Sequence, residues 1–182
     1  MQKLAKTIAF FFLLTGPAAT ASAQVLSGED IKTQLIKDWQ RAKAYTQEYL
    51  DAMPADKYSA KPVDSIRSFA QQMLHLAGGT VGLIGFATGE KISNFPRNME
   101  TSATAQTKDS VVYYVNQSYD FAIESIRKLD PGKLGEVIGQ GSRQGTRFAV
   151  ILKGFEHQTH HRGQTVIYIR LQGIRPPQEK LW

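Results

Sequence analysis

Apolar residues recur at helical spacing along most of the chain. The first such stretch begins at Ile31 and ends at Met53, directly before Pro54. Its apolar positions follow one another at steps of three, four or seven, which keeps their side chains on one face of a helix. We therefore expect an amphipathic helix over residues 28–53, with a stripe made of Ile31, Leu35, Trp39, Ala42, Tyr49 and Met53.

A second stretch of this kind follows Pro62. Asp64 and Ser65 are suitable N-terminal caps, so the pattern predicts a helix that opens at Pro62 and runs to about Phe86, ahead of Gly89. Its apolar positions are Ile66, Phe69, Ala70, Met73, Leu74, Leu76 and Ala77.

Residues 89–106 interrupt the pattern. They show no apolar period and contain Asn94, Pro96 and Asn98. Such a composition is typical of a long connection, and we expect the chain to cross over here or nearby.

Two further helices are predicted. One begins near Thr107 and ends at Asp130-Pro131-Gly132, because its apolar positions alternate steps of three and four as a bundle seam requires. The last runs from about Thr146 to Gln172, where Gly173 supplies a C-terminal cap. Between them, residues 133–145 are rich in glycine and predict either a short hairpin or an irregular loop. The fold class is therefore all-α, with four long helices.

The N-terminus has the layout of a secretory signal peptide. Lys3 and Lys6 precede an apolar run over residues 8–14, and Ala21-Ser22-Ala23 forms a small-residue cleavage site. The alternative, an uncleaved membrane anchor, needs roughly 20 apolar residues, far more than this run provides. We expect residues 1–23 to be cleaved and residues 24–182 to form one domain of a periplasmic or secreted protein without stable membrane insertion.

Charge and composition exclude several classes of function. The formal net charge falls from +6 to +4 when Lys3 and Lys6 are removed, and the basic residues are spread along the chain. No basic stripe with interleaved aromatic residues is present, so nucleic acid is not an expected partner. The chain has no cysteine, which excludes disulfides, thiolate ligands and a lipid anchor on an N-terminal cysteine.

All four histidines fall on two of the predicted helices. His157, His160 and His161 lie on the last helix, and His75 lies on the second. Residues four apart on a helix lie about 40° apart around its axis, so His157 and His161 can point at a common ion. His160 is better explained as a residue at the rim or in solvent.

A third ligand has to come from another helix, and His75 is the remaining histidine. Gly79 and Gly82 on its side of the helix leave room for an ion, but the helical wheel places His75 away from the core residue Met73. Spacing alone therefore leaves two interpretations open, a metal site and a surface or hydrogen-bonded histidine group. Three neutral imidazoles suit zinc, nickel, copper or iron, and without a fourth protein ligand they leave positions open, as in catalytic sites.

The residues around the histidines suggest structural roles. Arg162 is expected to pair with an acidic neighbour, either Glu156 or one on the first helix, and Gly163 to allow the close approach of another helix. Glu156 points about 100° away from His157 around the helix, so no general base can be named.

Several stretches of the chain resemble the DinB/YfiT-like metalloproteins. The resemblance covers most of residues 28–177, and the H-x3-H-H-R-G-Q string behind a single upstream histidine is fairly specific. It rests on Glu156 to Gln164, Tyr168-Ile169-Arg170, Gly173 to Pro177, Ala52 to Tyr58, Lys61-Pro62 and Ser68-Phe69-Ala70 before His75.

The resemblance implies a four-helix bundle with up-down-down-up order and a long crossover. It also implies one divalent metal ion held by His75, His157 and His161, zinc or nickel first, with iron or manganese as alternatives. Members are often homodimers, and the better understood ones transfer low-molecular-weight thiols to electrophiles or isomerise thiol adducts. Those thiols are cytoplasmic, whereas the predicted signal peptide directs this chain out of the cytoplasm.

Three functional hypotheses follow. The first is an exported metal-dependent transferase that acts on a small-molecule substrate. The second is a metal-dependent hydrolase, in which the ion lowers the pKa of bound water to about 7. The third is a non-catalytic bundle with a structural metal that binds a small ligand or a partner protein.

Overall fold

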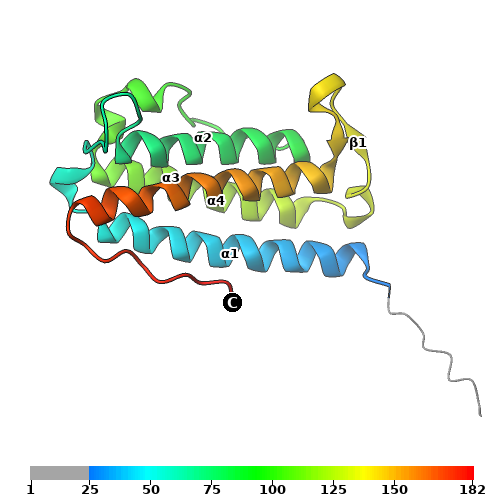
Figure 1. Ribbon diagram of the computed structural model, residues 1–182. Coiled ribbons are helices and arrows are strands. Elements are labelled where there is room, and N and C mark those ends of the chain that lie inside the picture. The colour runs from blue at the N-terminus through cyan, green and yellow to red at the C-terminus, as the bar shows by residue number, and fades with distance from the viewer. Residues whose placement is uncertain (1–24) are drawn as a thin grey trace, which may run out of the picture.

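Four long helices form the body of the molecule. The computed structural model describes residues 25–182, so the predicted signal peptide, residues 1–23, lies outside the described residues. The helices are α1 (Gly28–Ala52), α2 (Phe69–Thr88), α3 (Lys108–Lys128) and α4 (Arg147–Leu171). In Figure 1, α1 and α4 run in one direction and α2 and α3 in the other. The all-α four-helix bundle with up-down-down-up order is therefore confirmed.

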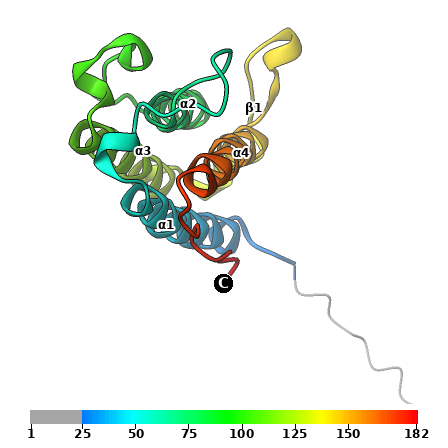
Figure 2. The same ribbon diagram turned by 60° about the vertical axis from the view of Figure 1, so that its left-hand side comes forward.

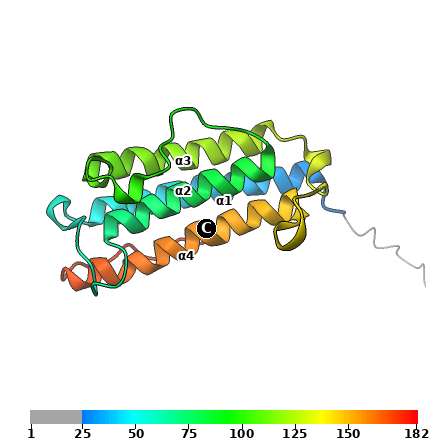
Figure 3. The same cartoon turned by 90° about the horizontal axis from the view of Figure 1, so that it is seen from above.

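The packing of the helices determines the path of the connection between α2 and α3. Both α1 and α2 pack against α3 and α4, so α1 and α2 lie diagonally across the bundle (Figure 2). Because α2 and α3 are parallel, residues 89–107 must return along the length of the bundle, and Figure 3 shows this crossover from above. It contains two short 3₁₀ turns, Met99–Thr101 and Thr104–Gln106. The predicted long connection is confirmed.

The predicted start of the second helix is wrong. Helix α2 begins at Phe69, because Ser68 and Gln71 form a capping box in which each side chain accepts a hydrogen bond from the other residue's backbone amide, at 3.2 and 2.9 Å. Residues 62–67 form a loop outside the helix, and Ile66 is exposed. A capping box of the same kind, made by Ser27 and Asp30, starts α1 as predicted.

The connection between α3 and α4 contains a hairpin. Strands β1 (Val137–Ile138) and β2 (Gly145–Thr146) pair antiparallel, which decides between the two predicted alternatives. Helix α4 ends close to the predicted residue: Gly173 has φ +74°, and the amides of Gly173 and Ile174 donate to the carbonyls of Arg170 and Ile169. This is the Schellman arrangement, which favours glycine. Further 3₁₀ turns are Ala55–Lys57, Pro131–Lys133 and Gly141–Arg143.

The core lies between the four helices and contains an aromatic centre. Trp39 on α1 is fully buried, and its ring meets Tyr119 of α3 and Phe155 of α4 edge to face, with centroid separations of 5.8 and 5.5 Å. Each such buried side chain contributes about 1.5–3 kcal/mol. Beyond α4 the chain turns back, and the Lys180 carbonyl accepts a hydrogen bond from Arg41 of α1 at 2.7 Å (Figure 1). No helix within residues 25–182 has the length and apolar character of a membrane span.

Arg162 is buried without the acidic partner that was predicted. It is 7% exposed, and within residues 25–182 no carboxylate lies within ion-pair distance of it. Its guanidinium instead donates to Gln158 Oε1 at 3.0 Å and to Thr46 Oγ1 at 3.4 Å, and stacks on the Tyr45 ring at 4.5 Å. Arg162 does contact the first helix as predicted, but its partners there are the Thr46 hydroxyl and the Tyr45 ring, not a carboxylate.

The expectation for Gly163 is also wrong. A Cβ atom at this position would meet nothing within 4 Å, so within the described part of the chain no helix approaches it. Helix α2 instead comes close at Gly154, which lies about two and a half turns nearer the start of α4. A Cβ there would lie 3.1 Å from Ile84 Cδ1.

Candidate metal centre

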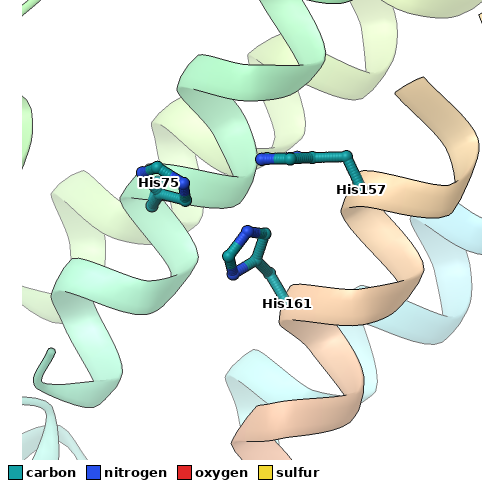
Figure 4. A group of neighbouring side chains, drawn as sticks. All are labelled: His75, His157 and His161. Carbon is teal, nitrogen blue, oxygen red and sulfur yellow. The ribbon is translucent and has the colours of Figure 1, made fainter. Parts of the chain in front are cut away.

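Three histidines from two helices meet in the groove between α2 and α4. His75 projects from α2, and His157 and His161 project from successive turns of α4 (Figure 4). Each offers a nitrogen, and these atoms lie within 4.8 Å of one another. An ion bound at 2.0–2.1 Å by each imidazole needs nitrogens about 3.4 Å apart. Small rotations of the side chains would close the gap between this separation and the one observed. The structure therefore brings together the three residues that were predicted as ligands.

A glycine on α2 makes room for one of these rings. A Cβ atom built on Gly79 would lie 2.0 Å from Cε1 of His157 and 2.6 Å from both of its ring nitrogens. The ring thus lies directly against the α2 backbone. Any larger residue at position 79 would have to displace it.

His75 is oriented by a carboxylate from the crossover. Its Nδ1 lies 2.7 Å from Oε1 of Glu100, and Arg67 donates to the other oxygen of Glu100 at 2.6 Å. When Nδ1 donates its proton to Glu100, Nε2 keeps a free lone pair, which is the tautomer that a metal ligand needs.

Glu100 is held in its charged form. Burial raises its pKa, but the hydrogen bonds from Arg67 and His75 outweigh this effect, so the pKa lies below its ordinary value. The Glu100 backbone is also fixed, since its carbonyl accepts hydrogen bonds from Gln71 and Gln106 at 3.0 and 2.8 Å. The crossover is therefore tied to α2 beside the triad.

His161 is the most buried of the three and has its own partner. Gln72 Nε2 lies 3.0 Å from His161 Nδ1, so the amide nitrogen donates a hydrogen bond to the ring. Burial, with smaller contributions from His157 and His75, lowers the pKa of His161 to about 4. The ring is therefore neutral at physiological pH, as ligation requires.

His157 carries a buried nitrogen without a hydrogen-bond partner. Its Nδ1 is enclosed, and nothing in the described part of the chain pairs with it. Burial, and then the neighbouring His75, lower the pKa of His157, so this ring is also neutral. An unpaired buried polar atom costs about 1–3 kcal/mol. The donor set fits a divalent ion, because three imidazoles converge and Nδ1 of one of them, His157, is buried without a partner.

Two cavities lie close to the triad, and His75 lines one of them. One of about 650 Å³ lies under the crossover and is lined by His75 and Glu100 together with Gly78, Gly82 and Phe95. A second of about 610 Å³ reaches from Gly79 towards the hairpin. Space for a small molecule therefore adjoins the triad.

The remaining candidates do not join the triad. His160 is exposed and bonds to Gln164 on its own helix at 3.0 Å, in agreement with a rim position. Glu156 is exposed on α4, and Glu100 is the carboxylate that contacts the triad. Sequence reasoning missed Glu100 and Gln72. Neither lies in a motif, and the only available signal is the general need of a ligating histidine for an outer partner.

A hydrogen-bonded network on the far side of α4 holds the helix that carries His157 and His161. Gln158 Oε1 accepts from Tyr119 at 2.7 Å and from Arg162 at 3.0 Å, and Tyr119 contacts Thr46 at 2.7 Å. These contacts link α4 to α3 and α1. They fix the rotation of α4 that turns its two histidines towards α2.

The fold and site together define an up-down-down-up helical bundle with three histidines in one groove. The family model described as the DinB family matches residues 27–181, so the chain belongs to the DinB family. The solved structures it resembles include a DinB-like protein from Bacillus cereus, with 16% identity, a TM-score of 0.70, and coverage of 81% of this chain and 97% of that one.

Two other solved structures have the same fold. A DinB-like protein from Bacillus subtilis is 18% identical, with a TM-score of 0.59 over 80% of this chain and 96% of that one. A conserved protein from Enterococcus faecalis is 16% identical, with a TM-score of 0.59 over 78% and 96%. The comparison with curated proteins found no match.

Proposed function

We propose that the protein is an exported metal-dependent transferase, in which His75, His157 and His161 hold one divalent ion and leave part of its coordination sphere to a small-molecule substrate. The proposal is supported mainly by the convergence of three imidazoles in a groove that adjoins two cavities. Zinc or nickel suits this ligand set best, with iron or manganese as alternatives. Export rests on the signal-peptide pattern of residues 1–23.

The surroundings of the triad favour transfer over hydrolysis. A bound divalent ion lowers the pKa of a ligated thiol or water and so supplies a nucleophile at neutral pH. Hydrolysis also calls for a base that handles the proton of water, but Glu100 is already engaged by Arg67 and His75. An acidic nucleophile such as a thiol needs no such base.

Metal binding is tested first. Elemental analysis of protein purified without chelator should find one equivalent of a divalent ion. His75→Ala, His157→Ala and His161→Ala should each lose it, whereas His160→Ala should retain it. Retention by all three triad variants would refute the site.

Transfer is tested on the metal-loaded protein. Conjugation of cysteine to 1-chloro-2,4-dinitrobenzene and hydrolysis of p-nitrophenyl acetate are measured side by side, with His157→Ala as the inactive control. Conjugation lost in the control supports the transferase, and hydrolysis without conjugation supports the hydrolase. A strong fall in the melting temperature on chelation, with neither activity, supports a structural ion instead.

A further inference from the structure

The second cavity has an apolar floor and a basic rim. It lies between α2, α4 and the turn Gly141–Arg143, and its floor is formed by Leu83, Phe86 and Val150. Arg143 and Lys153 lie at its edge, and no acidic residue lines it. Within residues 25–182 neither cation lies within ion-pair distance of a carboxylate.

Specific contacts hold the hairpin over this cavity. A Cβ on Gly139 would lie 2.9 Å from the Phe86 ring, so the hairpin packs directly on α2. Arg147 donates to the Ala87 carbonyl at 2.6 Å and pairs with Glu136 at 2.9 Å, which ties the hairpin to the end of α2. The cavity wall is therefore part of the fold.

The cavity lies next to the metal centre and shares Gly79 with it. Gly79, which lies against the His157 ring, also lines this cavity. Lys153 precedes His157 by four residues on α4, which places it about 6 Å along the helix axis from that ligand. A molecule in the cavity thus has Gly79 and the neighbouring His157 ring at one end and the two cations at the other.

We infer that the substrate of this site is a small amphipathic anion whose charged head binds Arg143 and Lys153, whose apolar body lies on Leu83, Phe86 and Val150, and whose reacting end faces the triad. The inference rests on the proposed function for the reaction and on charge complementarity for the ligand. Two unpaired cations above an apolar floor favour one negative charge on an otherwise apolar molecule.

Binding of three eight-carbon probes to the mature protein tests this. Octanoate, octanol and octylamine are titrated calorimetrically, below their aggregation limits, into metal-free and zinc-loaded protein. Octanoate should bind both forms about tenfold or more tighter than octanol, and octylamine weakest, since hydrogen bonds to charged groups are the strong ones. Equal binding of octanoate and octylamine would overturn the inference, and so would octanoate binding that requires zinc.

Variants locate the probe. The double variant Arg143→Gln/Lys153→Gln should lose the tenfold preference for octanoate and bind octanol as the wild type does. The charge-matched pair Lys91→Gln and Arg97→Gln, in the cavity under the crossover, should change neither. If the control pair abolishes the preference and the test pair does not, the anion site is not here.

A filling variant tests the apolar floor. A Cβ on Gly82 would meet nothing within 4 Å, and this residue lines the cavity, so Gly82→Leu should keep the fold and abolish binding of both octanoate and octanol. Unchanged octanoate binding in folded Gly82→Leu would contradict the assignment.

Two further measurements separate the possible failures. Vesicles of phosphatidylglycerol test a lipid as the ligand: binding to vesicles without binding of monomeric octanoate would reject the cavity in favour of a membrane surface.

Zinc content is measured for every variant. Normal zinc loading with no octanoate preference rejects only the ligand inference, whereas failure to load zinc in the wild type rejects the metal centre and leaves the octanoate result to stand alone.

Discussion

Gly79 and His157 are in direct contact across the groove between α2 and α4, with no space for a side chain at position 79. The contact involves the far end of the His157 side chain, so an added methyl group would move the ring and leave the backbones in place. At the neighbouring Gly78, a Cβ would meet nothing within 4 Å. Changes at the two glycines therefore distinguish an effect on helix stability from an effect on the geometry of the histidine triad.

We expect Gly79→Ala to weaken metal binding by about 10-fold or more and Gly78→Ala to leave it unchanged. Both changes should stabilise α2 by up to about 1 kcal/mol, because alanine is the better helix former. Competition with a chromophoric zinc chelator measures the affinity, and urea denaturation measures the stability. Equal zinc affinity in the two variants would show that the position of the His157 ring does not matter.

Glu100→Gln should reduce zinc affinity about 10- to 100-fold. Loss of the carboxylate removes the partner that orients His75 and favours its ligating tautomer, and changes of this kind cost that much in other metal sites. Glu90→Gln is the matched control, since Glu90 lines the same cavity but pairs with Lys128. The same chelator competition applies, and an equal loss in both variants would point to general electrostatics in place of a specific contact.

Acid should destabilise the metal-free protein. The pKa of His161 is about 4 in the folded state, against an ordinary value of 6.5. Between these values the unfolded chain binds more protons than the folded one, so stability falls as pH decreases from 6.5 towards 4. Above pH 6.5 this contribution does not change with pH.

Melting temperatures of the chelator-treated protein between pH 7.5 and 4.5 measure this effect. His161→Asn should flatten the decline, and His160→Asn, a change at an exposed histidine, should not. A decline of the same size in His161→Asn would assign the acid sensitivity to other groups.

Arg162→Ala should destabilise the bundle by about 2–4 kcal/mol. It removes two buried hydrogen bonds and a stacked cation, and Gln158 Oε1 keeps only its hydrogen bond from Tyr119. Arg170→Ala, an exposed change on the same helix, should stay within about 0.5 kcal/mol. Midpoints of urea denaturation compare the two, and similar midpoints would mean that the buried guanidinium contributes little.

The periodic part of the chain carried enough information to predict four long helices, whereas their up-down-down-up order came from the family resemblance. Apolar positions at helical steps mark α1 and α3 almost to their ends, because burial of one face determines where a helix can lie. The end of α4 is marked instead by its glycine cap, Gly173. The predicted start of α2 was wrong because Pro62 and Asp64 are residues that often begin a helix. The helix begins instead at the capping box of Ser68 and Gln71, whose S-x-x-Q pattern is visible in the sequence.

The candidate site was predictable only in part. The spacing of His157 and His161 shows that they share a face, but which residue of α2 faces them depends on the rotation of two packed helices. Glu100 lies in an irregular connection, where no period links a residue to its neighbours in space. Arg162 shows the same limit, since its partners are uncharged groups on α1 and α4 that no charge pattern reveals.

The order of the histidines along the chain determines when the centre can form. His75 lies on α2, whereas His157 and His161 lie on the last helix, so the three meet only after nearly all of the chain is available to fold. Capture of the proposed ion would then be coupled to the docking of α4. Under the proposed export, a chain that folds only after it leaves the cytoplasm would take its ion from the metals available outside.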